Sequence, residues 1–129
     1  MPYVAESGQS PVLKFLRELE RYEPENYAYY LYEKELIEAN GTDINHQHWK
    51  WVGDGLGEIR WKYKRKNMRI YCSEEIQQRV VMLHAEPKKW RTLKNEHRER
   101  CLERRADFRS PSYNQREREL LHEQRSANA

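Results

Sequence analysis

Two arginines at matching positions of successive predicted strands are the residues best suited to chemistry in this chain. Arg60 lies in the alternating stretch that begins at Glu58, and Arg69 lies in the next such stretch. Because side chains alternate across a strand, both guanidinium groups are expected on one exposed face of a sheet. A guanidinium keeps its charge and binds phosphate bidentately, so the pair is a candidate phosphate clamp, with Arg69 stabilising a transition state. The alternative is a solvated cross-strand pair with Glu58 as counter-ion.

Two neighbouring side chains could transfer protons or stack on a base. His84 ends the third predicted strand and titrates near neutrality, which suits a general acid or base. A lone histidine in a strand is more often structural, and the phase of His84 with Val80 and Met82 favours that alternative. Tyr71 is expected on the face of Arg69, where it could stack on a nucleobase or pack against a neighbouring strand.

Further cations flank the predicted strands and could hold an RNA backbone, although exposed lysines are commonly only solvated. A loop after the last strand could swing some of them toward the arginine face. These cations are Lys62, Lys64, Lys88, Lys89, Lys94 and Arg98.

No metal, cofactor or small-molecule ligand is expected. His46 and His48 are two residues apart, but no cysteine or carboxylate at suitable spacing completes a ligand set. The two cysteines, Cys72 and Cys101, are expected to be reduced thiols in the core.

The composition is that of one small, strongly charged domain. Charged residues make up 35% of the 129 residues, but 4 Trp, 9 Tyr and 2 Phe supply the rings of a core. Residues 57–109 hold 16 Lys and Arg against 8 Asp and Glu, which predicts one cationic side and an anionic partner. No apolar run resembles a signal peptide or membrane span, so a soluble, cytoplasmic protein with no membrane partner is expected.

Hydrophobic periodicity predicts the elements before the sheet. Tyr3-Val4-Ala5 could form a short edge strand. Ser10 is the expected N-cap of an amphipathic helix that has Pro11 at its first position. A second helix is predicted from Pro24 to just before Gly41, and residues 41–56 are interpreted as a loop.

The sheet and the last helix follow in the second half. The stretch from Gly57 to about Lys94 contains three short predicted strands, with Lys66-Asn67 as a tight turn. A third helix is predicted at Lys94–Phe108, and residues 110–129 are expected to form a polar, flexible tail after a domain at 1–109. The predicted fold is α+β, in β-α-α-β-β-β-α order with helices packed on one face of an antiparallel-rich sheet.

This order and several local strings resemble the RelE/ParE toxin superfamily, especially its phage-derived, HigB-like branch. The strings open the first helix, run through the strands and close the last helix. They are Ser10–Leu16, Gly53–Arg60, Arg69–Tyr71, Val80–His84 with Lys88–Lys89, and Lys94 with Arg104–Asp107. The chain departs from the family pattern where Gly57 directly precedes Glu58 and where Glu86-Pro87 precedes the double lysine.

The resemblance implies a toxin that cleaves ribosome-bound mRNA without a metal, through attack of the RNA 2′-hydroxyl on the adjacent phosphate. The implied partners are mRNA, the ribosome and a helix-turn-helix antitoxin. Alternatives are a ParE-like gyrase inhibitor that catalyses nothing and a phage protein with the fold but no activity. The residues implied as catalytic are Arg69, Arg60, His84, Lys88 and Lys89. Those implied in RNA binding are Lys62, Lys64, Tyr71, Lys94 and Arg98.

Overall fold

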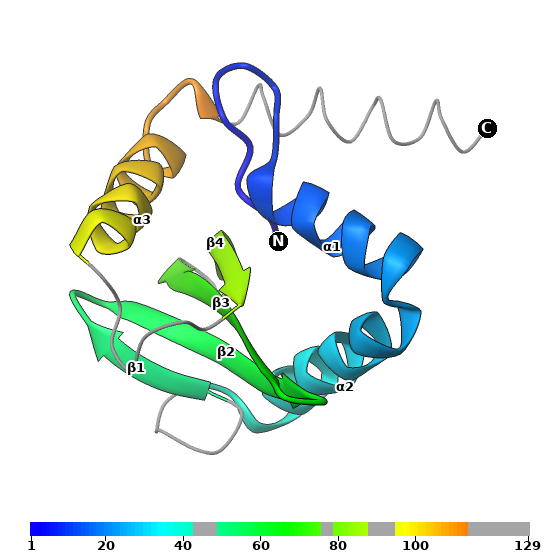
Figure 1. Ribbon diagram of the computed structural model, residues 1–129. Coiled ribbons are helices and arrows are strands. Elements are labelled where there is room, and N and C mark those ends of the chain that lie inside the picture. The colour runs from blue at the N-terminus through cyan, green and yellow to red at the C-terminus, as the bar shows by residue number, and fades with distance from the viewer. Residues whose placement is uncertain (43–48, 76–78, 88–94, 114–129) are drawn as a thin grey trace.

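The computed structural model describes residues 1–42, 49–75, 79–87 and 95–113. Helices α1 (Pro11–Tyr22) and α2 (Pro24–Asn40) come first and helix α3 (Asn95–Phe108) comes last. Between them lie strands β1 (Trp49–Gly53), β2 (Leu56–Tyr63), β3 (Lys66–Glu75) and β4 (Arg79–Pro87). In the described residues the strands form an antiparallel sheet in the order β1-β2-β3-β4 (Figure 1). The predicted α+β class is confirmed.

The two N-terminal helices begin at the predicted prolines, and α2 ends at the predicted glycine. Pro11 is at the first position of α1, and Ser10 occupies the N-cap position. The Ser10 hydroxyl does not cap the helix, because it donates instead to the Tyr3 carbonyl at 2.7 Å. Helix α2 ends before Gly41, whose φ of 77° is readily adopted by glycine.

The main core lies between α1, α2 and one face of the sheet. Trp61 reaches into it, and its indole Nε1 donates to Asn26 Oδ1 at 2.7 Å, so the buried nitrogen is satisfied. Cys72 is a buried free thiol in this cluster, as predicted. The helical members of the cluster are Val12, Leu16, Leu19, Tyr30 and Ile37, and strand members include Trp49, Ile59, Trp61, Tyr63, Met68, Ile70 and Met82.

A second core lies on the opposite face of the sheet, beneath α3 and the N-terminal segment. The sequence interpretation had the helices on one face only and the other face exposed and cationic, and both expectations are wrong. The few apolar residues of α3 are sufficient here because the N-terminal segment and Tyr113 complete the cover. The buried members are Tyr3, Val4, Leu56, Tyr71, Val81, Leu83, Cys101 and Tyr113.

The N-terminal segment and the residues that follow α3 meet in this second core. Val4 N–H donates to the Tyr113 hydroxyl at 2.9 Å, and the Tyr3 and Tyr113 rings stack with centroids 5.7 Å apart. Tyr113 lies beyond the predicted domain end at residue 109, yet only 1% of it is exposed. Residues 114–129, the rest of the predicted tail, lie outside the described residues.

Strand β1 occupies part of the predicted loop at 41–56. Trp49 pairs with Ile59, and the two-residue connection to β2 is Asp54-Gly55, both with positive φ, as in a type I′ hairpin. Trp49 is fully buried over Gly57, where an added Cβ would lie 1.9 Å from a ring carbon. This close approach explains why a glycine directly precedes Glu58.

Two other predicted boundaries differ. The β2–β3 turn is at Lys64-Arg65 rather than Lys66-Asn67, with Lys64 at a φ of 55°. The predicted strand at Tyr3-Val4-Ala5 is reduced to an isolated parallel bridge between Pro2 and Met82. None of the described helices is both long and apolar enough to cross a bilayer.

Candidate functional site

A β-bulge in β4 determines which of its side chains lie beneath α3. Tyr71 pairs with His84, whereas the adjacent Cys72 pairs with Met82, so Leu83 is an extra residue in β4. Beyond the bulge the alternation of side chains is therefore reversed relative to the start of the strand.

The bulge changes the expected position of His84. Uniform alternation would put His84 in phase with Val80 and Met82, on the face covered by α1 and α2. Because of the extra residue, His84 lies on the α3 side together with Glu86. The predicted phase of His84 is wrong, and the strand carries a histidine and a carboxylate on the face of the two arginines.

Strand register arranges six side chains into two rows on this face. Arg60 pairs directly with Arg69, which confirms the predicted matching of the two arginines. Two like charges opposite each other repel, so acidic neighbours are needed to stabilise them. The rows are Glu58–Tyr71–His84 and Arg60–Arg69–Glu86.

Arg69 is buried, and the prediction of an exposed phosphate-binding position for it is wrong. Only 6% of Arg69 is exposed, and its Nη1 lies 3.3 Å from Glu58 Oε2 and donates to the Tyr71 hydroxyl at 3.4 Å. Glu58 is 1% exposed, so the ion pair is withdrawn from water. The alternative interpretation, with Glu58 as counter-ion, is confirmed, although the pair is buried and not solvated.

Tyr71 is also buried, and its ring lies parallel to that of His84 with centroids 6.3 Å apart. Burial raises the pKa of the Tyr71 hydroxyl above its usual value, while the hydrogen bond from Arg69 opposes that shift. Because the two rings are parallel, Tyr71 packs against the His84 imidazole on the sheet side.

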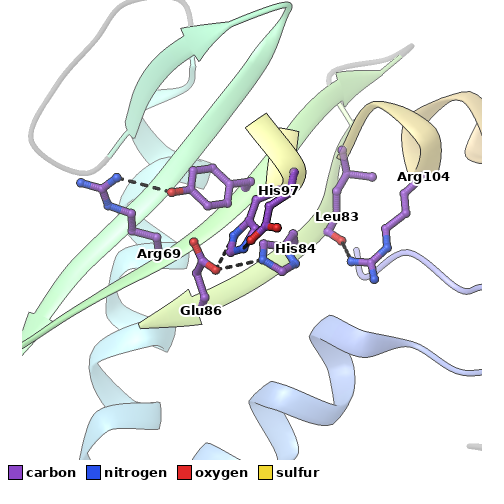
Figure 2. A network of polar contacts seen from close by, with 8 residues as sticks. Arg69, Leu83, His84, Glu86, His97 and Arg104 are labelled. Atoms are coloured by element: carbon purple, nitrogen blue, oxygen red, sulfur yellow. Dashed lines mark hydrogen bonds and ion pairs between the residues drawn. The ribbon is translucent and has the colours of Figure 1, made fainter. Parts of the chain in front are cut away.

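Three groups capable of proton exchange, the side chains of His84, Glu86 and His97, meet on the α3 side of the sheet. Glu86 Oε2 lies 3.1 Å from His84 Nε2 and 2.6 Å from Nδ1 of His97, a residue in the first turns of α3 (Figure 2). The histidine rings meet edge to face with centroids 4.8 Å apart. The 2.6 Å contact lacks hydrogen-bond geometry, so the buried His97 Nδ1 has no hydrogen-bond partner among the described residues.

Burial lowers the pKa of His84 below its usual value. Glu86 opposes this shift by favouring the imidazolium, whereas His97 and Arg104 reinforce it. The neutral imidazole is therefore the main form of His84 at neutral pH, with a ring nitrogen available to accept a proton.

Arginines of α3 fix this helix over the sheet. Arg98 donates to Asp54 Oδ2 at 3.0 Å and to the Val52 carbonyl at 2.7 Å, next to the β1–β2 turn. Arg104 donates to the carbonyl of Leu83, the bulge residue, at 2.6 Å (Figure 2). Arg98, a predicted RNA-binding residue, thus has a structural role in the described fold.

The remaining predicted cations lie near the end of β2 or fall outside the described residues. Lys62 and Lys64 are exposed at the end of β2, and Lys62 pairs with Asn67. Lys88, Lys89 and Lys94 fall in the undescribed segment between β4 and α3, and His46 and His48 fall in the one before β1.

Glu86 and His97 are the site residues that sequence reasoning missed. His97 is the fourth histidine of the chain and lies in a helix with few apolar residues, and its spacing from His84 follows no motif. Only the packing of α3 against the sheet face that carries Arg60 and Arg69 could have indicated the position of His97.

Comparison with known proteins identifies the family. The model of a family described as phage-derived protein Gp49-like (DUF891) matches residues 17–106, which is more than half of the chain. No curated protein and no solved structure matches. The matched region includes the sheet, α3 and the His84–Glu86–His97 group. The chain belongs to the Gp49-like, phage-derived family, which is a RelE-like, toxin-like family.

Proposed function

We propose that this chain is the toxin of a toxin–antitoxin pair and cleaves ribosome-bound mRNA in the cytoplasm. The RNA 2′-hydroxyl would attack the adjacent phosphate and leave a 2′,3′-cyclic phosphate, with no metal ion required. The observation that carries this proposal is that His84 and Glu86, the last members of the two rows, lie in contact with His97 of α3. Membership of a toxin-like family supports the toxin role and a helix-turn-helix antitoxin as partner.

The reaction requires a proton acceptor for the 2′-hydroxyl and a proton donor for the departing 5′-oxygen. We assign the acceptor role to His84, because Glu86 lies 3.1 Å away and would stabilise the imidazolium as it forms. His97 would be the donor, since its ring is the second imidazole of the group. Both side chains are only partly buried, at 11% and 18% exposure, and can be reached by RNA.

The reaction also requires positive charge near the phosphate. Arg60 is half-buried and Lys62 exposed on the same face of β2, so these cations replace Arg69 in the proposed phosphate contact. Arg69 becomes a positioning residue, since it contacts Glu58 and Tyr71. Lys88 and Lys89 would act as additional catalytic cations, and Lys64, Lys94 and Arg98 would bind the RNA backbone.

The test is a cell-free translation reaction with purified protein, in which primer extension maps mRNA 5′ ends. Wild-type protein is expected to give new ends inside translated codons only when ribosomes are present. His84→Gln and His97→Gln should each reduce the cleavage rate by about 10²–10⁴-fold, the usual contribution of a general acid or base. His122→Gln, in the segment after Tyr113, is the matched control and should cleave like wild type.

Intact mRNA with folded wild-type protein would refute the proposal. A supercoiling assay with DNA gyrase would then test the ParE-like alternative. Cleavage that survives both His84→Gln and His97→Gln would leave the toxin role standing and remove the assigned proton-transfer residues.

A further inference from the structure

His84, Glu86 and His97 have the composition and spacing of a metal-ligand set. Each offers one ligand atom, and these atoms all lie within 4.8 Å of one another. Two imidazoles and one carboxylate, with a fourth position open, are the protein ligands of many zinc sites. We propose that these three residues bind one divalent transition-metal ion, with Zn²⁺ as the representative ligand.

The contacts at His97 support this inference independently of any RNA chemistry. Its Nδ1 is buried and 2.6 Å from Glu86 Oε2, yet makes no hydrogen bond among the described residues. A buried polar atom without a partner is costly, and a metal ion would accept the lone pair of this nitrogen. Glu86 would supply the negative charge that two neutral imidazoles lack.

The spacing requires little rearrangement. Bonds of about 2.0–2.1 Å in a tetrahedral zinc site put neighbouring ligand atoms about 3.3 Å apart. The Glu86–His84 contact of 3.1 Å is already close to that value, while the Glu86–His97 contact of 2.6 Å must open slightly. The ligand nitrogens of His84 and His97 lie within 4.8 Å of each other and would have to move closer together, by rotation of their side chains, to bind the same ion.

Neighbouring residues position His84 on β4 and His97 on α3. The Tyr71 ring lies parallel to that of His84, and Arg104 attaches α3, which carries His97, to the bulge in β4. Outer contacts of this kind orient metal ligands. Imidazole with carboxylate favours Zn²⁺, Ni²⁺ or Co²⁺ over Mg²⁺ and Ca²⁺, which take oxygen ligands.

The experiment measures metal binding by the full chain without an affinity tag. Protein stripped with a chelator is dialysed against Zn²⁺ and the bound metal is counted, with Mg²⁺ in a parallel sample. The expected result is one zinc per chain, and no Mg²⁺ bound. Substitution of Co²⁺ is expected to give the visible absorption bands of a tetrahedral site.

His97→Gln and Glu86→Gln test the ligand assignment. Loss of a supporting outer contact typically costs 10–100-fold in affinity, so loss of a ligand should weaken zinc binding by at least about 100-fold. His48→Gln is the matched control, because it removes a histidine of the His46-x-His48 pair from the same chain. It should bind zinc as tightly as wild type.

Three results would overturn the inference: no zinc bound at micromolar concentration, undiminished binding by both ligand variants, or loss of binding in His48→Gln. A denaturant unfolding curve establishes that each variant is folded, and the two ligand variants lie on different elements, so a misfolded one leaves the other informative. The inference is separable from RNA cleavage, because zinc binding is measured without RNA. Zinc would occupy imidazole nitrogens assigned above to proton transfer, so metal-free protein is expected to be the form that cleaves mRNA.

Discussion

Arg69→Ala is expected to destabilise the fold before it affects any reaction. The side chains of Arg69 and Glu58 are 7% and 2% exposed and lie 3.3 Å apart, so the substitution removes one partner of a buried ion pair. Removing one partner of a buried pair costs about 3–5 kcal/mol. Domains have about 5–15 kcal/mol of stability in total, so the variant should be marginal.

The assay is urea unfolding followed by tryptophan fluorescence, since Trp49 and Trp61 are both buried in the core. If the free energy of unfolding falls by about 2 kcal/mol for each molar increase in urea, the urea concentration at the unfolding midpoint should fall by roughly 2 M. Arg65→Ala, at an exposed turn position, is the matched control and should change stability by less than about 0.5 kcal/mol.

A double variant tests the physical reason. Glu58→Met with Arg69→Met removes both charges at similar volume and should recover most of the lost stability, because buried pairs are often replaceable by apolar residues. If Arg69→Ala unfolds within 1 kcal/mol of wild type, the buried-pair reasoning is refuted. Loss of toxicity in Arg69→Ala alone would therefore say little about catalysis.

Four further substitutions or treatments have defined outcomes. Gly57→Ala should lower the melting temperature sharply, because its Cβ would lie 1.9 Å from the Trp49 ring; an unchanged melting curve would refute this contact. Cys72 and Cys101 are buried, and burial raises the pKa of the Cys101 thiol to about 12, so neither should react with a thiol reagent at pH 8 until urea is added. Because the unfolded Cys101 thiol ionises from about pH 9, its contribution to stability is lost as the pH rises from 9 to 12, which unfolding curves across that range can follow. Tyr113→Phe removes the acceptor of a buried backbone N–H and should cost about 1–3 kcal/mol in urea unfolding, with no change expected for Phe at the exposed Tyr22.

Local signals in the sequence were sufficient to predict most of the helices and strands. The prolines at 11 and 24 predicted where the first two helices begin, and Gly41 predicted the end of the second, in agreement with the structure. Alternation predicted β2 and β3 and put Arg60 and Arg69 on one face of adjacent strands. Strand β1 was missed because its hairpin signal, Asp54-Gly55, was interpreted as part of a loop.

The site itself could be predicted only in part, because it depends on features that act across the chain. The bulge at Leu83 reverses the phase of β4, and no local pattern marks it. Arg69 is buried in contact with Glu58 and Tyr71 of the sheet, which alternation within β3 alone does not indicate. His97 joins His84 through tertiary packing alone.

The contact between Val4 and Tyr113 has a consequence for the order of folding during synthesis. The N-terminal segment can complete the second core only when Tyr113, which lies 109 residues later in the chain, is available to accept the Val4 N–H. Domains fold as units as they emerge from the ribosome. The second core therefore depends on a contact that spans 109 residues of chain, and closing a loop of that length is expected to make the docking of the N-terminal segment a late step in folding.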